Sequence, residues 1–315
     1  TTWAETLAHP SDAQLYKDIG INIFAHLWDG PTTEQMSQVQ AAGLYVIAMV
    51  SDTTVSSSFS TIYGNSVSSH FFGDELDTLP VAENLYLPSW LMAGYASGVI
   101  AGADLYTLPT AMRDMSNLIR RKDPTRPVYN QYTKPLCIPN WGSWYLNDAN
   151  RRMYAAASDI VSFDWYVISD PYDTGHVWST YDSTTLCRSY ALNCKPVWPY
   201  IGPSAVFPDP AATPTLAQIN GMIWNSIIGG ARGIQYFNHN FYSGGPGGGT
   251  QHLLIDPNYA ATSNYVHSVN DRLLALAPVL NSRFVDGYVS VTGNMSVMSK
   301  FYGGKFYIFA IPHQA

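Results

Sequence analysis

The chain has 315 residues, of which 46% are hydrophobic, so it can bury a sizeable core in one main domain. Charged residues make up only 12%, and the formal net charge is -7. A basic surface for nucleic acid or for an anionic membrane is therefore not expected. No apolar run reaches the roughly 18 residues that a transmembrane helix needs, so we expect no membrane span.

The expected strands are short apolar segments rich in Val, Ile, Phe and Tyr, and longer amphipathic stretches separate them. This alternation predicts repeated βα units around a parallel sheet. The strands are expected at 3–6, 21–27, 44–50, 70–75, 127–132, 160–166, 196–201 and 233–238. The helices are expected at 32–42, 88–95, 108–121 and 264–280, with an irregular loop at 51–69. Eight such strands predict an α/β fold, a (β/α)8 TIM barrel over residues 1–282, with its active site at the C-terminal strand ends.

A different pattern follows the last helix. Short alternating segments at 288–292, 296–301 and 305–311 predict strands, and Gly303-Gly304 predicts a hairpin turn between the last two. Residues 283–315 are therefore expected to form a small antiparallel β segment. A truncated β-sandwich and a small sheet packed on the barrel are both compatible with this pattern.

The aromatic content is high, with 9 Trp, 22 Tyr and 12 Phe. Aromatic rings offer flat faces to the C–H side of sugar rings, while hydroxyl and amide groups bond the sugar OH groups. This composition favours a protein that binds an oligosaccharide or polysaccharide, although a tyrosine-rich core would account for it too. No signal peptide opens the chain, and we expect a mature, secreted, extracellular monomer whose leader has been removed.

The three cysteines are Cys137, Cys187 and Cys194. The last two are close in sequence, and a disulfide between them is expected, with Cys137 free or buried. The eight histidines are scattered, and no H-E-x-x-H pair occurs. We therefore expect neither a catalytic metal nor another cofactor.

Glu75 is the most prominent candidate catalytic residue. It ends the apolar run that begins at His70, and the only other glutamates in the chain are Glu5, Glu34 and Glu83. A carboxylate at the tip of a buried strand, with Asp74 beside it, is what a general acid requires. The alternative is a structural carboxylate at a helix N-terminus or in an ion pair.

Three segments carry a resemblance to a known group of enzymes: Gly73-Asp74-Glu75-Leu76-Asp77, Asp159-Ile160-Val161-Ser162-Phe163-Asp164-Trp165-Tyr166 and Lys195-Pro196-Val197-Trp198-Pro199-Tyr200-Ile201. Together with the predicted strand order, these segments resemble the clan A glycoside hydrolases, which are (β/α)8 barrels such as those of families 5 and 39. The resemblance implies cleavage of β-glycosidic bonds, usually with retention. It also implies an acid/base glutamate at the end of strand four, matched by Glu75, and a strand-six tyrosine beside the nucleophile, matched by Tyr166.

The chain departs from that pattern at two positions. Asp74 stands where these enzymes usually have asparagine, and Gly202 stands where the strand-seven nucleophile glutamate is expected. Three interpretations stay open. In the first, a substitution removed the nucleophile. In the second, another carboxylate, Glu5, Asp164 or Asp29, replaces it, including in an inverting reaction. In the third interpretation, the barrel binds glycans without cleaving them. Glycoside hydrolysis needs two carboxyl groups or an equivalent anion, so Glu75 alone is insufficient.

Further substrate-binding candidates lie at or near the predicted strand ends, where the βα loops converge. Each could equally serve in packing or loop structure. The set comprises Glu5, Trp28, Asp29, Asp74, Gln131, Tyr132, Trp165, Trp198, Tyr200, Asn238 and His239.

Overall fold

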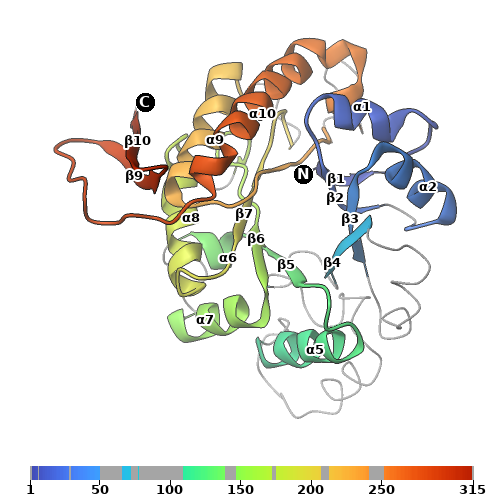
Figure 1. Cartoon of the computed structure of the whole chain (residues 1–315), viewed down its shortest axis with the longest axis horizontal. Coiled ribbons are helices and arrows are strands. Elements are labelled where there is room, and N and C mark those ends of the chain that lie inside the picture. The colour runs from blue at the N-terminus through green and yellow to red at the C-terminus, as the bar shows by residue number, and fades with distance from the viewer. Residues whose placement is uncertain are drawn as a thin grey trace.

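The computed structural model describes residues 2–5, 7–27, 30–49, 66–71, 77, 109–138, 147–171, 175–206, 213–240 and 252–313. Figure 1 shows strands at the centre of the molecule with helices around them. The strands of this central sheet are β1 (Thr2–Glu5), β2 (Ile23–Leu27), β3 (Tyr45–Met49), β4 (Val67–Phe71), β5 (Val128–Tyr132), β6 (Ile160–Phe163), β7 (Val197–Ile201) and β8 (Gln235–Tyr236).

The central sheet is a closed parallel barrel in the order β1 to β8. Closure is made at Thr2, which pairs in parallel with Phe24 of β2 on one side and with Tyr236 of β8 on the other. All residues of β5 and β6 are buried, as expected for parallel strands that are covered on both faces. The predicted (β/α)8 barrel is therefore confirmed.

The helices of the described chain form the outer layer. They are α1 (Asp12–Asp18), α2 (Thr33–Ala42), α5 (Pro109–Lys122), α6 (Lys134–Cys137), α7 (Asp148–Ala157), α8 (Ser179–Tyr190), α9 (Leu216–Gly229) and α10 (Ala260–Leu280), with 3₁₀ turns η4 (Leu253–Ile255) and η5 (Pro257–Tyr259). The predicted helix at 88–95 lies outside the described residues. Among the helices that are described, none combines the length and apolarity that crossing a bilayer requires.

Local signals explain where α2 begins and ends. The Thr32 side chain accepts a hydrogen bond from the Gln35 backbone N–H, and the Gln35 side chain accepts one from the Thr32 N–H. This reciprocal pair satisfies two donors at the start of the helix. Gly43 ends α2 with a φ of 67°, a left-handed conformation that glycine adopts without a Cβ clash. The prediction of a helix ended by Gly43 is confirmed.

Two strands differ from their predicted bounds. β4 was expected to begin at His70 but begins at Val67, because its backbone pairs with β3 from Val46 onwards, and the predicted residues 72–75 of this strand lie outside the described residues. β6 was expected to continue to Tyr166 but ends at Phe163, after which the chain turns and the Ser169 N–H donates to the Tyr166 carbonyl. Strand pairing, which the sequence pattern does not report, sets the start of β4 and the end of β6.

The buried side chains form an outer and an inner core. The outer core lies between the sheet and the helices and includes Phe24, Val46 and Val161. The inner core fills the barrel and includes Ala25, Ile47, Tyr129, Ile160, Tyr166, Tyr200, Val206 and Phe237. In the part of the chain that the structure describes, these side chains pack the interior of the barrel, as is usual for this fold.

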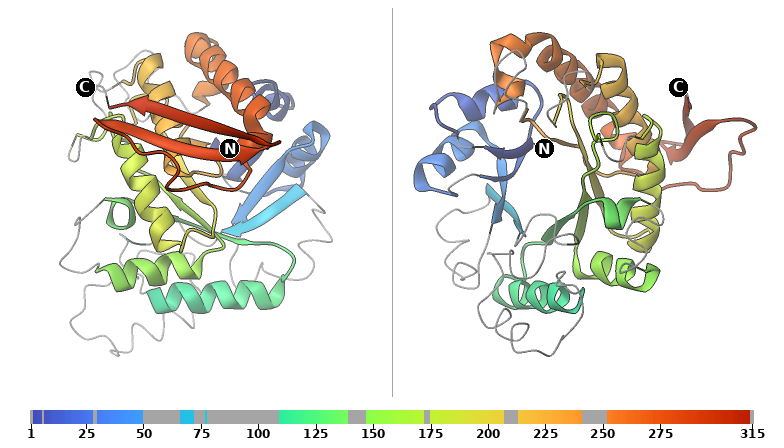
Figure 2. Two further views of the ribbon diagram at one scale, coloured as in Figure 1. Left: turned by 60° about the vertical axis from the view of Figure 1, so that its left-hand side comes forward. Right: turned by 180° about the vertical axis from the view of Figure 1, so that it is seen from behind.

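The C-terminal segment forms a two-stranded antiparallel hairpin, β9 (Met295–Tyr302) and β10 (Lys305–Pro312), which lies outside the helical layer (Figure 2). Gly303 and Gly304 have φ values of 57° and 75° and make the predicted turn. Phe309 of β10 stacks on Trp224 of α9. The strand predicted at 288–292 does not form. Upstream of it, Phe284 makes a single antiparallel β-bridge with Lys300.

The predicted disulfide is wrong. Cys187 lies inside α8, buried against α6 with its Sγ 4.0 Å from the Leu136 carbonyl oxygen, whereas Cys194 is exposed after the helix and points to the Ala191 carbonyl. Both cysteines and the buried Cys137 are free thiols. No helix was predicted around Cys187, and the helix α8 that forms there turns its thiol into the core.

Candidate active site

The C-terminal ends of the strands converge on one face of the barrel, where active sites of this fold lie. Four predicted site residues lie outside the described residues: Trp28, Asp29, Asp74 and Glu75. β4 is described as far as Phe71, and the prediction that Glu75 ends this strand falls on residues outside the described part of the chain. Glu5 is the last residue of β1, and its backbone pairs with Leu27 at the same edge of the sheet.

Tyr166 and Gly202 lie side by side at this face. Gly202 follows the last residue of β7, and a Cβ atom built on it would lie 3.0 Å from Cδ1 of Tyr166 and 3.0 Å from Cγ2 of Val206. The Tyr166 ring is buried and packs against Phe237, with ring centroids 5.2 Å apart. A side chain at position 202 would therefore begin next to the Tyr166 ring.

A polar network crosses the barrel below Tyr166. The Tyr129 hydroxyl lies 2.8 Å from Ser162 Oγ, 3.2 Å from the Tyr200 hydroxyl and 3.0 Å from Gln235 Oε1. Gln235 Nε2 also donates to Ser162 Oγ at 2.6 Å. Because every polar atom of this layer has a partner inside the barrel, it forms a rigid floor. Tyr200, predicted to contact sugar, belongs to this floor.

Gln131 lies one step nearer the open end. It pairs in register with Ser162, which faces the interior, and it stands two residues beyond Tyr129 on the same face of β5. Gln131 is buried, and its Oε1 accepts no hydrogen bond from the described part of the chain. A buried carbonyl oxygen in this position is suited to accept a hydrogen bond from a ligand hydroxyl.

Asp164 lies directly after β6 and is buried. Its N–H donates to the Tyr132 carbonyl at 3.0 Å, and its own carbonyl accepts from Thr133 Oγ1 at 3.1 Å. The backbone of Asp164 thus extends the ladder with β5 by one residue. This contact fixes Asp164 at the C-terminal face of the barrel.

Two histidines occupy the ends of β2 and β8. His26 is buried and has a φ of 80°, which is rare for a residue other than glycine. Burial, and then the neighbouring His239, lower the pKa of His26 from 6.5 to about 3. The His26 ring is therefore neutral at ordinary pH, and its Nδ1 lies 2.8 Å from the Ala25 carbonyl oxygen. His239 is fully buried.

Four predicted substrate contacts point elsewhere. Tyr132 faces the outer core, where its hydroxyl donates to the Tyr154 carbonyl at 2.7 Å, because alternation along β5 turns it away from Gln131. Trp165 packs in the outer core and lines a surface groove along α8. Trp198 lines a cavity with Gly20 and Gly233 at the N-terminal end of the barrel, since it is only the second residue of β7.

Asn238 is the fourth correction. It is fully buried, its Oδ1 accepts from the Leu254 N–H at 2.7 Å, and its Nδ2 donates to the Tyr16 hydroxyl. Asn238 thus ties the end of β8 to η4 and α1. Its side chain supports the loops and does not face the barrel interior.

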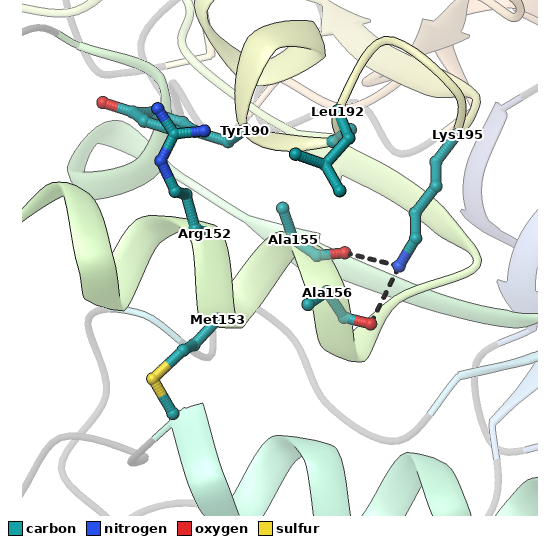
Figure 3. Close-up of a pocket in the computed structure, with 8 residues that line it drawn as sticks. Arg152, Met153, Ala155, Ala156, Tyr190, Leu192 and Lys195 are labelled. Atoms are coloured by element: carbon teal, nitrogen blue, oxygen red, sulfur yellow. Dashed lines mark hydrogen bonds between the residues drawn. The ribbon is translucent and has the colours of Figure 1, made fainter.

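A separate cavity of about 330 Å³ lies between α7 and the end of α8 (Figure 3). Its lining is apolar apart from Arg152 and Lys195, and the Lys195 ammonium donates to the carbonyls of Ala155 and Ala156 at the C-terminal end of α7. Lys195 precedes β7, so this cavity is at the N-terminal end of the barrel, opposite the C-terminal face. It holds no carboxylate.

Two residues at the C-terminal face were not predicted from the sequence, His26 and Asp77. His26 lies within a predicted strand, and nothing in that pattern signals its positive φ. Asp77 belongs to the quoted segment around Glu75; its buried carboxylate accepts hydrogen bonds from the backbone of α6. In the described part of the chain, no three His, Cys, Asp or Glu side chains are grouped as metal ligands.

No protein-family profile and no curated protein matches this chain. Solved structures do match. A β-galactosidase from the psychrophilic Marinomonas ef1 has a TM-score of 0.56 at 14% identity, over 88% of this chain and 60% of that enzyme. A polyextremophilic β-galactosidase from Halorubrum lacusprofundi has a TM-score of 0.54 at 14% identity, over 93% and 60%.

A family 39 glycoside hydrolase from the gut symbiont Bacteroides cellulosilyticus WH2 matches all of this chain and 70% of its own, with a TM-score of 0.51 at 11% identity. The chain spans less than two thirds of the two β-galactosidases. At these identities the similarity establishes the fold, and this chain has the (β/α)8 barrel fold that is found in clan A glycoside hydrolases.

Proposed function

We propose that this protein is a glycoside hydrolase acting on β-linked glycans at the C-terminal face of the barrel. The contact between Tyr166 and Gly202 is the observation that carries the proposal. Tyr166, three residues after β6, lies against position 202, directly after β7, where the enzymes that this chain resembles place a nucleophile. Gln131 and the neutral His26 add hydrogen-bonding groups near the same face.

In the proposed retaining reaction, Glu75 donates its proton to the glycosidic oxygen as the bond to the anomeric carbon breaks. A carboxylate at position 202 would attack the anomeric carbon from the other face and form a glycosyl ester. Glu75 would then take a proton from water, whose oxygen attacks the anomeric carbon and frees the carboxylate. Tyr166, adjacent to position 202, would orient that carboxylate.

With Gly202 the chain lacks this nucleophile, so an added small anion should replace it. Azide or formate would attack the anomeric carbon of an aryl β-glycoside, the aryloxide would leave, and the product would have the opposite anomeric configuration. Acceleration by azide, with a glycosyl azide as product, would support the retaining assignment. The control is Glu75→Gln, which should slow substrates with poor leaving groups by about 10²-fold or more.

One observation favours a second candidate. Position 202 is enclosed by Tyr166 on one side and Val206 on the other, so a side chain there must displace a neighbour. If glycine is the natural residue, then the protein is either an inverting enzyme that pairs Glu75 with Asp164 or Glu5, or a glycan-binding barrel without turnover. Asp164 at the catalytic face supports the inverting alternative.

A panel of aryl β-glycosides and β-linked polysaccharides separates these functions. The protein as it stands, Gly202→Glu, Gly202→Ala and Asp164→Asn should be compared. Activity only in Gly202→Glu supports the retaining enzyme, with Gly202→Ala as the control for crowding. Activity without substitution that Asp164→Asn abolishes supports inversion. Glycan binding without turnover in any variant contradicts hydrolysis. Secretion and a monomeric state stay predictions from composition.

A further inference from the structure

The cavity between α7 and the end of α8 combines an apolar interior with positive charges at its edge. Its volume of about 330 Å³ is at the lower end of the range of pockets that hold small molecules. It lies at the N-terminal end of the barrel, away from the face proposed for glycoside hydrolysis. Its apolar lining comes from Met153, Ala155, Ala156, Ala191 and Leu192.

Leu192 forms one wall of this cavity. It comes two residues after the end of α8, and Figure 3 shows its side chain facing Ala155 across the cavity. Leu192 is 71% exposed, so no other part of the described chain covers this wall. An apolar group that binds against Leu192 would remove hydrocarbon surface from water, which is favourable.

Arg152 provides a positive charge at the rim of the cavity. Its Cζ lies 5.5 Å from the centroid of the Tyr190 ring, and in the described chain its guanidinium donates to no carboxylate. Asp148, one turn earlier on α7, accepts instead from the Tyr190 hydroxyl at 2.8 Å and from Arg151 at 3.4 Å. Both residues lower the pKa of Asp148 more than Arg152 does. A guanidinium stacked on a ring keeps its N–H edge open, and that edge matches a carboxylate.

Lys195 provides the second positive charge, and its hydrogen bonds are made within the protein. Its ammonium donates to the carbonyls of Ala155 at 3.0 Å, Ala156 at 2.8 Å and Ser158. These carbonyls belong to the C-terminal end of α7, whose partial negative charge would otherwise repel an anion. Because an ammonium has three donors, Lys195 contributes charge to the cavity and no further hydrogen bond. The hydrogen bonds to an anion therefore come from Arg152.

We propose that this cavity is a binding site for a small organic anion with an apolar body, of the class of medium-chain carboxylates. The carboxylate of the ligand pairs with the N–H edge of Arg152, and its hydrocarbon part lies against Leu192 and Ala155. Lys195 adds attraction at longer range. The two positive charges disfavour an organic cation, and the apolar lining disfavours a sugar. This site is independent of the proposed glycoside hydrolysis.

Calorimetric titration with sodium octanoate tests the site. Sodium acetate carries only the charge of this probe, and octan-1-ol carries only its apolar body. Arg152→Gln removes the charge of the rim, and the matched control is Arg272→Gln, an exposed arginine on α10 outside the cavity. Leu192→Gly removes the apolar wall. Leu192 has a φ of 55°, which glycine adopts without a Cβ clash, so this variant should unfold at no lower a temperature than the unsubstituted protein.

Octanoate is expected to bind about tenfold more tightly than acetate or octan-1-ol, and each cavity variant should weaken octanoate binding about tenfold. Octan-1-ol binding should respond to Leu192→Gly and not to Arg152→Gln, and Arg272→Gln should change neither. Equal octanoate affinity of Arg152→Gln and the unsubstituted protein overturns the anion site. Unchanged binding in Leu192→Gly places octanoate elsewhere and also overturns it. Octanoate that binds no better than acetate, or does not bind, contradicts the proposal too.

Discussion

The carboxylate of Asp77 accepts a hydrogen bond from the backbone N–H of Thr133 at 2.9 Å, across the start of α6. Its second oxygen accepts from the Leu136 N–H at 3.2 Å. Asp77 comes two residues after Glu75 and is fully buried. The segment that carries the proposed general acid is therefore anchored at one end to the C-terminal edge of β5.

Replacing Asp77 by alanine should destabilise the protein, because two buried N–H groups lose their acceptor. Each unsatisfied N–H group should lower the free energy of unfolding by about 1–3 kcal/mol, which urea denaturation would measure. Asp77→Asn keeps one acceptor oxygen and should lose less. Equal stability of Asp77→Ala and the unsubstituted protein would contradict the role of this carboxylate as an anchor.

Position 202 should tolerate a small side chain at a modest cost. A Cβ atom there is 3.0 Å from both Tyr166 and Val206, so Gly202→Ala should lower the free energy of unfolding by about 1–3 kcal/mol through overpacking. Val206→Ala in the same chain should restore part of that loss, because it removes one of the two crowding atoms. Thermal unfolding of the single and double variants measures this coupling.

His26 should make stability depend on pH in the acid range. Its folded pKa of about 3 is below the ordinary 6.5, so between these values the unfolded chain binds the extra proton. Stability should therefore fall as pH decreases from 6.5 towards 3. His26→Asn, which tolerates the positive φ, should flatten this dependence in thermal unfolding measured across that range. An unchanged slope would show that His26 is protonated in the folded protein.

Lys300 should make the stability of the protein depend on pH in the alkaline range. It is buried beside Phe284 with Arg232 and Arg188 nearby, and its ammonium donates to the Ser282 carbonyl. Burial, followed by the two arginines, lowers the pKa of Lys300 from 10.5 to about 7. Below pH 7, Lys300 is protonated in both the folded and the unfolded protein, so its buried charge destabilises the folded state. Stability should therefore rise between pH 7 and 10.5, and Lys300→Met should abolish that rise.

The sequence by itself determined the barrel. Runs such as those of β5 and β6 are buried on both faces, and capping signals such as Thr32, Gln35 and Gly43 fix where helices begin and end. These are local or periodic signals, and each can be read within a short window of the chain. The closing hairpin was equally readable from Gly303-Gly304.

Only the tertiary structure decided which strand-end side chains face the barrel mouth. Gln131 faces the interior and Tyr132 the outer core, while Trp198 lies at the opposite end of the barrel, because alternation, register and position along a strand place each residue. The same is true of Cys187, which a helix turned into the core, and of Asn238, which binds two distant segments. The adjacency of Tyr166 and Gly202 arises from the parallel pairing of β6 with β7, which brings together the residues that follow these two strands.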